Sequence, residues 1–288
     1  MKKITVVLLL AILSITSIWS YTFENFEYDL DDAQTGIKIT KYTGAEEIIT
    51  VPSTIEDMPV TTIGERAFNS TNPKEVILPE SIEIIEEKAF KSVRSLEKIN
   101  FPSSLTKIDD AAFFGCSSLK NIPISINVEY GGNCFSDTGV EEVTIPENFG
   151  IIRKGKTLIQ DPFNMKDDSY TRVFESTSTS SGIFSRCKNL KVINLPKRAY
   201  IPSMMFRDCG IATDGIELYI SKGVAVYRGA FGDANISKIT IEEGHKQITI
   251  IDGFFKDVIP TGLGYYAISL AGLKEKQALL ARGIDEKY

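Results

Sequence analysis

Apolar positions recur along this chain in a fixed order, and a column of phenylalanines marks the repeat most plainly. The same order of residues leads to the Phe in three segments, Ile63 to Phe68, Ile85 to Phe90 and Ile108 to Phe113. One Phe per repeat then follows at Phe135, Phe184, Phe206, Phe231 and Phe255. Successive members lie 22, 23, 22, 49, 22, 25 and 24 residues apart, so one interval holds a repeat plus about 26 extra residues. Self-similarity at such a period is typical of a repeat architecture.

A short β-branched run lies about a dozen residues after each Phe. Its alternation of period two predicts a strand with one buried face, and the Pro that often follows ends it because Pro cannot donate to a ladder. The runs are 49–52, 76–79, 99–102, 143–146, 193–196, 218–220 and 239–241. Between Pro and Phe, a stretch such as Ser81 to Ile85 predicts a second, shorter strand, followed by a helical turn that carries an Ala-Phe pair.

One such unit cannot bury its apolar face alone, so neighbouring units must stack into a continuous core with capped ends. We therefore predict a β-rich solenoid, a curved right-handed coil of about eight repeats of 22–25 residues over 48–270. An N-terminal cap over 21–47 contains a hairpin around 31–36, and residues 271–288 form a C-terminal helical cap. Seven or eight unrelated hairpins are the alternative.

Residues 1–20 read as a signal peptide. Lys2 and Lys3 precede an apolar core from Ile4 to Ile18 that is too short for a stable membrane span, and cleavage is expected between Ser20 and Tyr21. A retained N-terminal anchor is the alternative. No later stretch approaches the roughly 18 apolar residues that a span needs. We expect an exported protein that is secreted, at the cell surface or periplasmic, with no membrane span in the mature chain.

The fullest repeat, Pro102 to Leu119, contains Ile108, the pair Ala112-Phe113, and Cys116. This order resembles the BspA-like (Treponema-type) leucine-rich repeat surface protein family over roughly residues 28 to 260. The resemblance implies a β-rich leucine-rich-repeat solenoid, and roles in adhesion or contact with host extracellular proteins. The Ala of the pair becomes another residue in later repeats, namely Cys134, Ile183, Met205 and Phe254.

Four cysteines in an exported chain raise the question of disulfides. Cys116, Cys187 and Cys209 each lie three residues after the repeat Phe, in a slot for small buried side chains that free Cys fills well. Cys187 and Cys209 stack at about the 4.8 Å strand spacing, which suits a disulfide. Parallel in-register side chains rarely present the required dihedral, however, so we favour free buried thiols over a bridge.

Catalytic chemistry has few candidate residues. The single histidine, His245, lies in a loop-like stretch without a nucleophile or orienting partner, so we interpret it as solvated. Acidic pairs at 46–47, 109–110, 141–142 and 167–168 are of the kind a glycosidase uses, but the first three fall at exposed or turn positions. No zinc, phosphate-loop, dinucleotide or calcium pattern occurs. We therefore predict that the chain is not an enzyme and has no cofactor and no metal.

Charge narrows the range of partners. The chain is 43% hydrophobic and 24% charged, as expected of a folded protein, and its formal net charge is -6. Loss of Lys2 and Lys3 with the leader takes this from -6 to -8. An acidic balance argues against nucleic acid and against an anionic lipid surface.

Two surfaces remain as candidate sites for a protein partner. Solenoids usually bind through a sheet face, and alternation turns the same positions of each main strand outward. The outward residues that we nominate are Glu142, Thr144, Val192, Asn194, Glu217 and Tyr219. The row is mixed in sign and has one aromatic, so a merely solvated face is an equal alternative.

The insertion at about 150–181 is the second candidate, because insertions in solenoids map to loops that often carry binding. Arg153, Lys154 and Lys156 form a basic cluster there, and Tyr170 adds an aromatic side chain. The arms 151–159 and 170–175 are predicted to pair as a protruding hairpin. A tolerated decoration without function is the alternative.

The sequence thus favours an exported protein–protein interaction module, with cell-surface adhesion or host-protein binding as its role. A periplasmic or envelope scaffold that binds partners of its own cell is the alternative. The partner, the mode of attachment and the oligomeric state stay open.

Overall fold

A computed structural model describes residues 21–149, 152–153, 156–157, 182–202, 204–221, 223–226, 230–242, 249–251 and 267–269. The predicted leader (1–20), His245, Phe255 and the predicted helical cap at 271–288 lie outside these residues, as do Lys154 and Tyr170.

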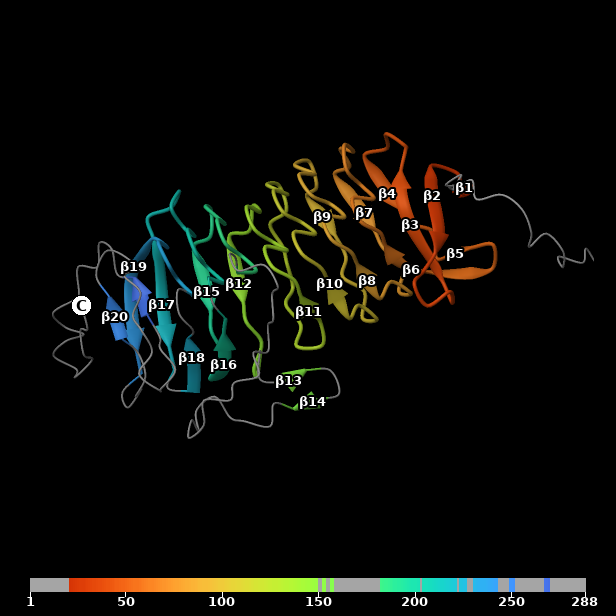
Figure 1. The fold of residues 1–288 in the computed structure, drawn as a ribbon. Coiled ribbons are helices and arrows are strands. Elements are labelled where there is room, and N and C mark those ends of the chain that lie inside the picture. Colours follow the sequence, from red (N-terminus) through yellow and green to blue (C-terminus); the bar gives the residue numbers. More distant parts are fainter. Residues whose placement is uncertain are drawn as a thin grey trace, which may run out of the picture.

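The described chain forms a β-solenoid of about seven coils, as the Phe column predicts (Figure 1). The first strands of the coils form a main sheet in which neighbouring strands are parallel, and the coil that contains 121–123 contributes no strand to it. Toward the N-terminus this sheet comprises β4 (Ile48–Thr50), β7 (Glu75–Ile77) and β9 (Lys98–Ile99). Toward the C-terminus it comprises β12 (Glu142–Thr144), β15 (Val192–Asn194), β17 (Ile216–Ile220) and β19 (Ile236–Ile241).

The second strands of the coils build a second sheet on the other side of the core. It contains β6 (Met58–Ile63), β8 (Ile84–Ile85), β10 (Lys107–Ile108) and β11 (Glu129–Tyr130), which confirms the second strand expected between Pro and Phe. Further along the chain, β16 (Arg198–Ile201) pairs with β18 (Gly223–Val226), and β20 (Thr249–Ile251) pairs with β21 (Ala267–Ser269).

The turns that carry the Phe are not helical, which corrects the sequence-based expectation. The described residues contain no helix. Arg66 and Ser70 flank Phe68 with φ of 54° and 64°, and the equivalent residues of the next coils repeat this left-handed pair. A left-handed residue ends any helical path, so Phe68 N donates to Ala89 O of the next coil at 2.9 Å instead of to its own turn. The turns therefore form a third ladder between coils.

The Phe side chains stack into a continuous spine at the centre of the solenoid. All seven from Phe68 to Phe231 are fully buried, and consecutive ring centroids lie 4.6–5.8 Å apart. Phe135 and Phe184 are 49 positions apart in the sequence, yet their rings stack at 5.5 Å. The insertion between them therefore leaves the spine unbroken. The chain re-enters the repeat at Gly182, where an added Cβ would lie 2.1 Å from the Met204 backbone.

The hairpin expected in the insertion is present in a different form. β13 (Ile152–Arg153) pairs antiparallel with β14 (Lys156–Thr157) through a two-residue loop, so the first predicted arm folds back on itself instead of running straight to 159. The arm predicted at 170–175 lies outside the described residues. Figure 1 shows β13 and β14 below the solenoid.

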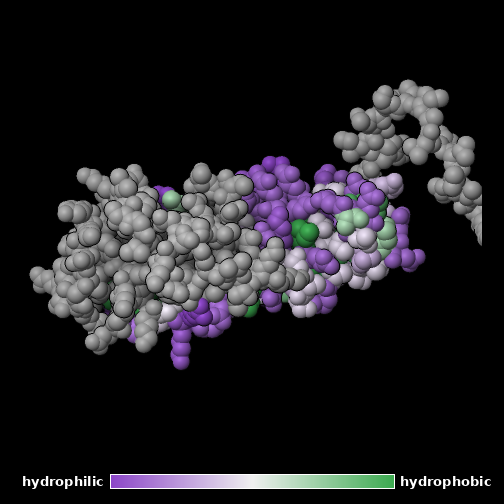
Figure 2. Space-filling model, turned by 60° about the horizontal axis from the view of Figure 1, so that its bottom comes forward, coloured by the Kyte–Doolittle hydropathy of each residue, from purple (hydrophilic) through white to green (hydrophobic). Residues whose placement is uncertain are grey.

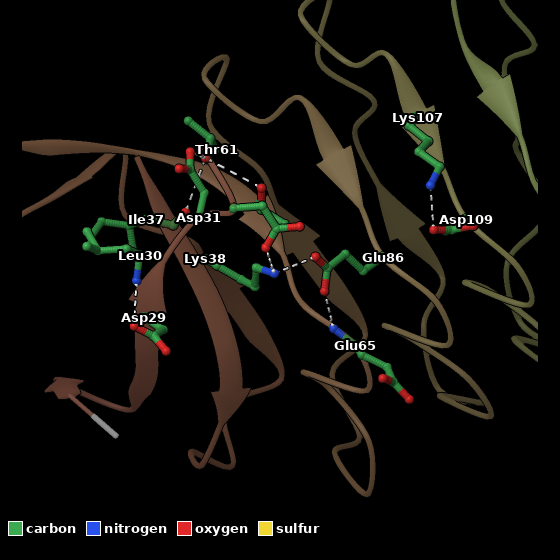
Figure 3. A network of polar contacts seen from close by, with 12 residues as sticks. Asp29, Leu30, Asp31, Ile37, Lys38, Thr61, Glu65, Glu86, Lys107 and Asp109 are labelled. Atoms are coloured by element: carbon green, nitrogen blue, oxygen red, sulfur yellow. Dashed lines mark hydrogen bonds and ion pairs between the residues drawn. The ribbon is translucent and has the colours of Figure 1, made fainter. Parts of the chain in front are cut away.

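The N-terminal end is closed by antiparallel strands: β1 (Tyr21–Phe23), β2 (Phe26–Leu30) and β3 (Ile37–Tyr42). The short β5 (Thr54–Ile55) pairs with β6. Polar contacts tie this cap to the first coils (Figure 3). Asp31, which is buried, accepts from Thr61 Oγ1 at 2.8 Å, and Lys38 lies 2.7 Å from Glu86. Burial alone would raise the pKa of Asp31, but its hydrogen bonds to the Thr35 amide and Thr61 hold the pKa below the ordinary value.

Candidate functional site

The six nominated sheet residues all lie on one exposed face. Val143 and Ile193 point inward and are buried, while Glu142, Thr144 and Asn194 on either side point outward and are exposed. Parallel pairing places Glu142 beside Val192 and Thr144 beside Asn194. Glu217 lies beside Val192 on the next strand, and Tyr219 follows two residues further along β17. Strand alternation therefore brings together residues up to 77 positions apart.

Hydrogen bonding divides this face into two parts. Asn194 Nδ2 donates to Glu142 Oε1 at 2.7 Å and to Thr144 Oγ1 at 3.1 Å, so these side chains satisfy one another. The next two strands place Glu217 opposite Lys238 and Tyr219 opposite Thr240. Across the residues that the structure describes, these four side chains make no hydrogen bond or ion pair. Their donors and acceptors are available to a partner.

Two apolar side chains lie within the same face. Val192 is 40% exposed and Tyr219 is 53% exposed. Interface hot spots are enriched in Tyr, which adds a large contact area and a polar tip at low entropic cost. Tyr219 is therefore the strongest single anchor on this face. The second-sheet side differs: Figure 2 shows mainly polar surface with small separate apolar patches over the part of that side which is described.

The second candidate surface, the basic cluster of the insertion, lies only partly within the described residues. Arg153 and Lys156 are directly opposite each other in the β13–β14 hairpin, which brings two of the three basic residues together. The positions of Lys154 and Tyr170 lie outside the described residues.

All four cysteines are free and buried. The thiols of Cys116, Cys187 and Cys209 each donate to a Phe carbonyl of the preceding coil, at 3.1, 3.3 and 3.0 Å. Burial raises the pKa of the Cys116 thiol to about 12, and it also raises that of Cys209. A protonated thiol is a donor and not a nucleophile, so Cys116 and Cys209 have a structural role.

Candidate chemistry elsewhere is sparse. No three His, Cys, Asp or Glu side chains gather closely enough to hold a metal ion within the described ranges. Both carboxylates of the acidic pair 109–110 already have partners within the protein: Lys107 lies 2.7 Å from Asp109, and Asp110 accepts from the Gly132 amide. Among these residues there is also no helix of the length and apolarity needed to cross a membrane.

A family model described as the BspA type leucine rich repeat region matches six copies over residues 37–156 and 173–258. The chain belongs to the BspA-type leucine-rich repeat family. The break in the match, 157–172, falls inside the insertion inferred from the Phe spacing. Proteins of this fold are typically interaction scaffolds without catalytic activity, and their partners are proteins.

Two solved leucine-rich repeat structures have a similar fold. A leucine rich cell surface protein from Faecalibacterium prausnitzii is 25% identical, with a TM-score of 0.53 over 77% of this chain and 54% of that one. A leucine-rich repeat protein from Bacteroides ovatus is 18% identical, with a TM-score of 0.57 over 86% of this chain and 61% of that one. The chain thus spans between half and two thirds of these proteins. A search of curated proteins found no match.

Proposed function

We propose that this BspA-type protein is an exported interaction module that binds a protein partner through the outward face of β12, β15 and β17. The observation that carries the proposal is the available cluster around Tyr219: an exposed aromatic side chain beside the unpaired carboxylate of Glu217 and next to exposed Val192. This combination of a rigid anchor and free polar groups is typical of binding surfaces.

Cell-surface adhesion or contact with a host extracellular protein is the proposed role. Support comes from the family match, from the cell-surface description of the Faecalibacterium protein, and from the leader-like sequence at 1–20. The competing role is a periplasmic or envelope scaffold for proteins of the same cell. Protease shaving of intact cells separates the two: surface display predicts loss of the chain, whereas protection until the envelope is opened would refute the adhesion role.

The binding surface is tested by affinity for a partner captured on intact host cells or on the producing cell's own envelope. Tyr219→Ala is expected to weaken binding about 30-fold, corresponding to about 2 kcal/mol for a hot-spot side chain. Ile77→Ala is the matched control, since Ile77 is the similarly exposed outward residue of β7. Equal losses from both variants, or none from either, would refute the proposed surface.

The basic hairpin is a second proposed contact, supported by the strand register that pairs Arg153 with Lys156 and so brings two basic residues together. Basic residues gathered in one segment attract an acidic partner surface, and the attraction is stronger in low salt. Arg153→Gln together with Lys154→Gln and Lys156→Gln should therefore reduce binding to the same partner in low salt. An unchanged affinity would limit the contact to the sheet face, and Tyr170 would lose its proposed role with the hairpin.

A further inference from the structure

A column of charged side chains alternates in sign from coil to coil beside the main sheet. Each member lies directly before the first outward position of a coil's main strand or, for Lys120, before the equivalent segment 121–123, which forms no strand. The members are Glu47, Lys74, Glu97, Lys120, Glu141 and Lys191. Six coils therefore read minus, plus, minus, plus, minus, plus without an exception, although the insertion intervenes before the last.

The backbone holds these residues in register. Lys74 N donates to Glu47 O at 2.7 Å, Glu97 N to Lys74 O at 2.8 Å, and Lys191 N to Glu141 O at 2.8 Å. Strands stacked in parallel bring equivalent positions to about 4.8 Å, so each charge has the previous and the next as its nearest neighbours along the column.

Three of the five neighbouring pairs of the column form ion pairs, and Glu97 lies between Lys74 and Lys120 without one among the described residues. Lys74 Nζ lies 2.9 Å from a Glu47 carboxylate oxygen. Lys120 and Lys191 approach the two oxygens of Glu141 from opposite sides, each at 2.8 Å. These two ammonium groups lower the pKa of Glu141 to about 2, and Glu47 with Glu97 raises that of Lys74. Glu141 is thus a carboxylate held between two cations of the column.

The apolar core cannot supply the order of the coils. Its columns carry the same residue types from coil to coil, a Phe in the spine and Val, Ile or Leu in the strands, so a coil would pack nearly as well on its second neighbour as on its first. Displacement by one coil would set Lys against Lys and Glu against Glu throughout the column, whereas the native order has no like-charge contact.

We propose that the alternating column selects the order and register of the coils during folding, so that a coil rejects any neighbour one position out of place. Charged flanking positions choose partners in coiled coils by the same principle. The column ends at Lys191, where the next two coils place Ile216 and Ile236 in register as buried residues. Selection therefore acts on the first six coils.

Three full-length proteins of identical composition test this proposal. The first is the natural chain. The second carries Glu97→Lys with Lys120→Glu, which creates a Lys–Lys and a Glu–Glu contact. The third inverts all six members, which exchanges every sign and keeps the alternation. Each is unfolded in urea, refolded in about 20 mM salt, and measured for the yield of native monomer, for swapped dimer by size exclusion, and for Tm.

The exchanged protein should refold to monomer with a yield reduced at least about twofold, with more dimer and a Tm lower by about 2–4 °C. The inverted protein should match the natural chain, and 1 M salt should remove the differences because exposed charges are then screened. An inverted protein as impaired as the exchanged one would overturn the proposal. So would an exchanged protein with lowered Tm but full monomer yield, because the column would then stabilise without selecting order.

Discussion

The N-terminal part of the main sheet (β4, β7 and β9) and its C-terminal part (β12, β15, β17 and β19) share one spine but use their outward side chains differently. Near the N-terminus, polar groups are paired within the protein, beside the exposed aliphatic side chains of Ile48 and Ile77: Glu75 lies 3.9 Å from Lys98, and the Asn100 side chain donates to Leu78 O and accepts from Leu78 N. Near the C-terminus, Glu217 and Tyr219 are exposed without such partners among the described residues.

A proline separates the two parts. Pro123 takes the outward position that Ile77, Asn100 and Thr144 hold in their coils, and it arrives two residues earlier than the Pro that usually ends a strand. Since Pro lacks the N–H for a ladder bond, no strand forms at 121–123 and the main sheet divides there. Stacking therefore fixes the inward positions of each coil but leaves its outward positions free to differ.

Substitutions in the shared Phe spine are expected to destabilise both parts of the solenoid to a similar extent. Phe90→Ala and Phe206→Ala each remove a fully buried ring from between two others, so each should lower the free energy of unfolding by about 3–5 kcal/mol. Urea titration measures both. A loss below about 1 kcal/mol in the C-terminal variant alone would show that the spine is not equally packed across the two parts.

The cap is expected to stabilise the N-terminal part only. Asp31→Ala leaves the Thr35 amide and Thr61 hydroxyl without their charged acceptor and should cost about 2 kcal/mol. Since the folded-state pKa is lowered, this contribution is present above the unfolded pKa of about 4 and is lost as the pH falls through the folded value. Asp32→Ala, at a side chain 90% exposed, is the control and should change stability little.

Removal of residues 152–180 tests whether the insertion contributes to stability, because the coils on either side already stack through Phe135 and Phe184. We expect stability to stay within about 1–2 kcal/mol of the natural chain or to rise slightly, since a shorter loop costs less entropy to close. Thermal unfolding decides this. A collapse of cooperative unfolding would show that the segment is structural.

Pro123→Thr tests whether the proline divides the sheet. The new amide at position 123 should donate to the carbonyl of Ile99 and become protected from hydrogen exchange. Stability should change by less than about 1 kcal/mol, because the added hydrogen bond is offset by the lost rigidity of Pro. Pro79→Thr, at an ordinary strand end, should gain no protection. Fast exchange at position 123 would assign the division to another cause.

Much of this architecture could be predicted from the sequence, because each weak local pattern recurs in every repeat. The spine, both strands of each coil and the inward–outward alternation follow from columns that recur seven or eight times. The helical turn was wrong because a left-handed φ at Arg66 or Lys88 leaves no mark in residue type. The first predicted hairpin arm, 151–159, was wrong because the pairing of β13 with β14 inside it is a single local event that no other repeat reports.

The candidate site was predictable in place but not in detail. Alternation gave the six outward residues, whereas the Asn194 bridge between Glu142 and Thr144 needed side-chain geometry. The alternating charge column was present in the sequence at the repeat spacing, yet its meaning depends on contacts such as Glu141 with Lys120 and Lys191.

We propose that a partner binds the C-terminal part of the main sheet face (β12, β15, β17 and β19) and not the N-terminal part (β4, β7 and β9). A photo-crosslinking amino acid placed at position 219, and separately at position 77, tests this directly on intact cells. We predict a specific crosslinked product from position 219 that competes with unlabelled protein, and none from position 77. Equal products from both positions, or a product from position 77 alone, would contradict the claim.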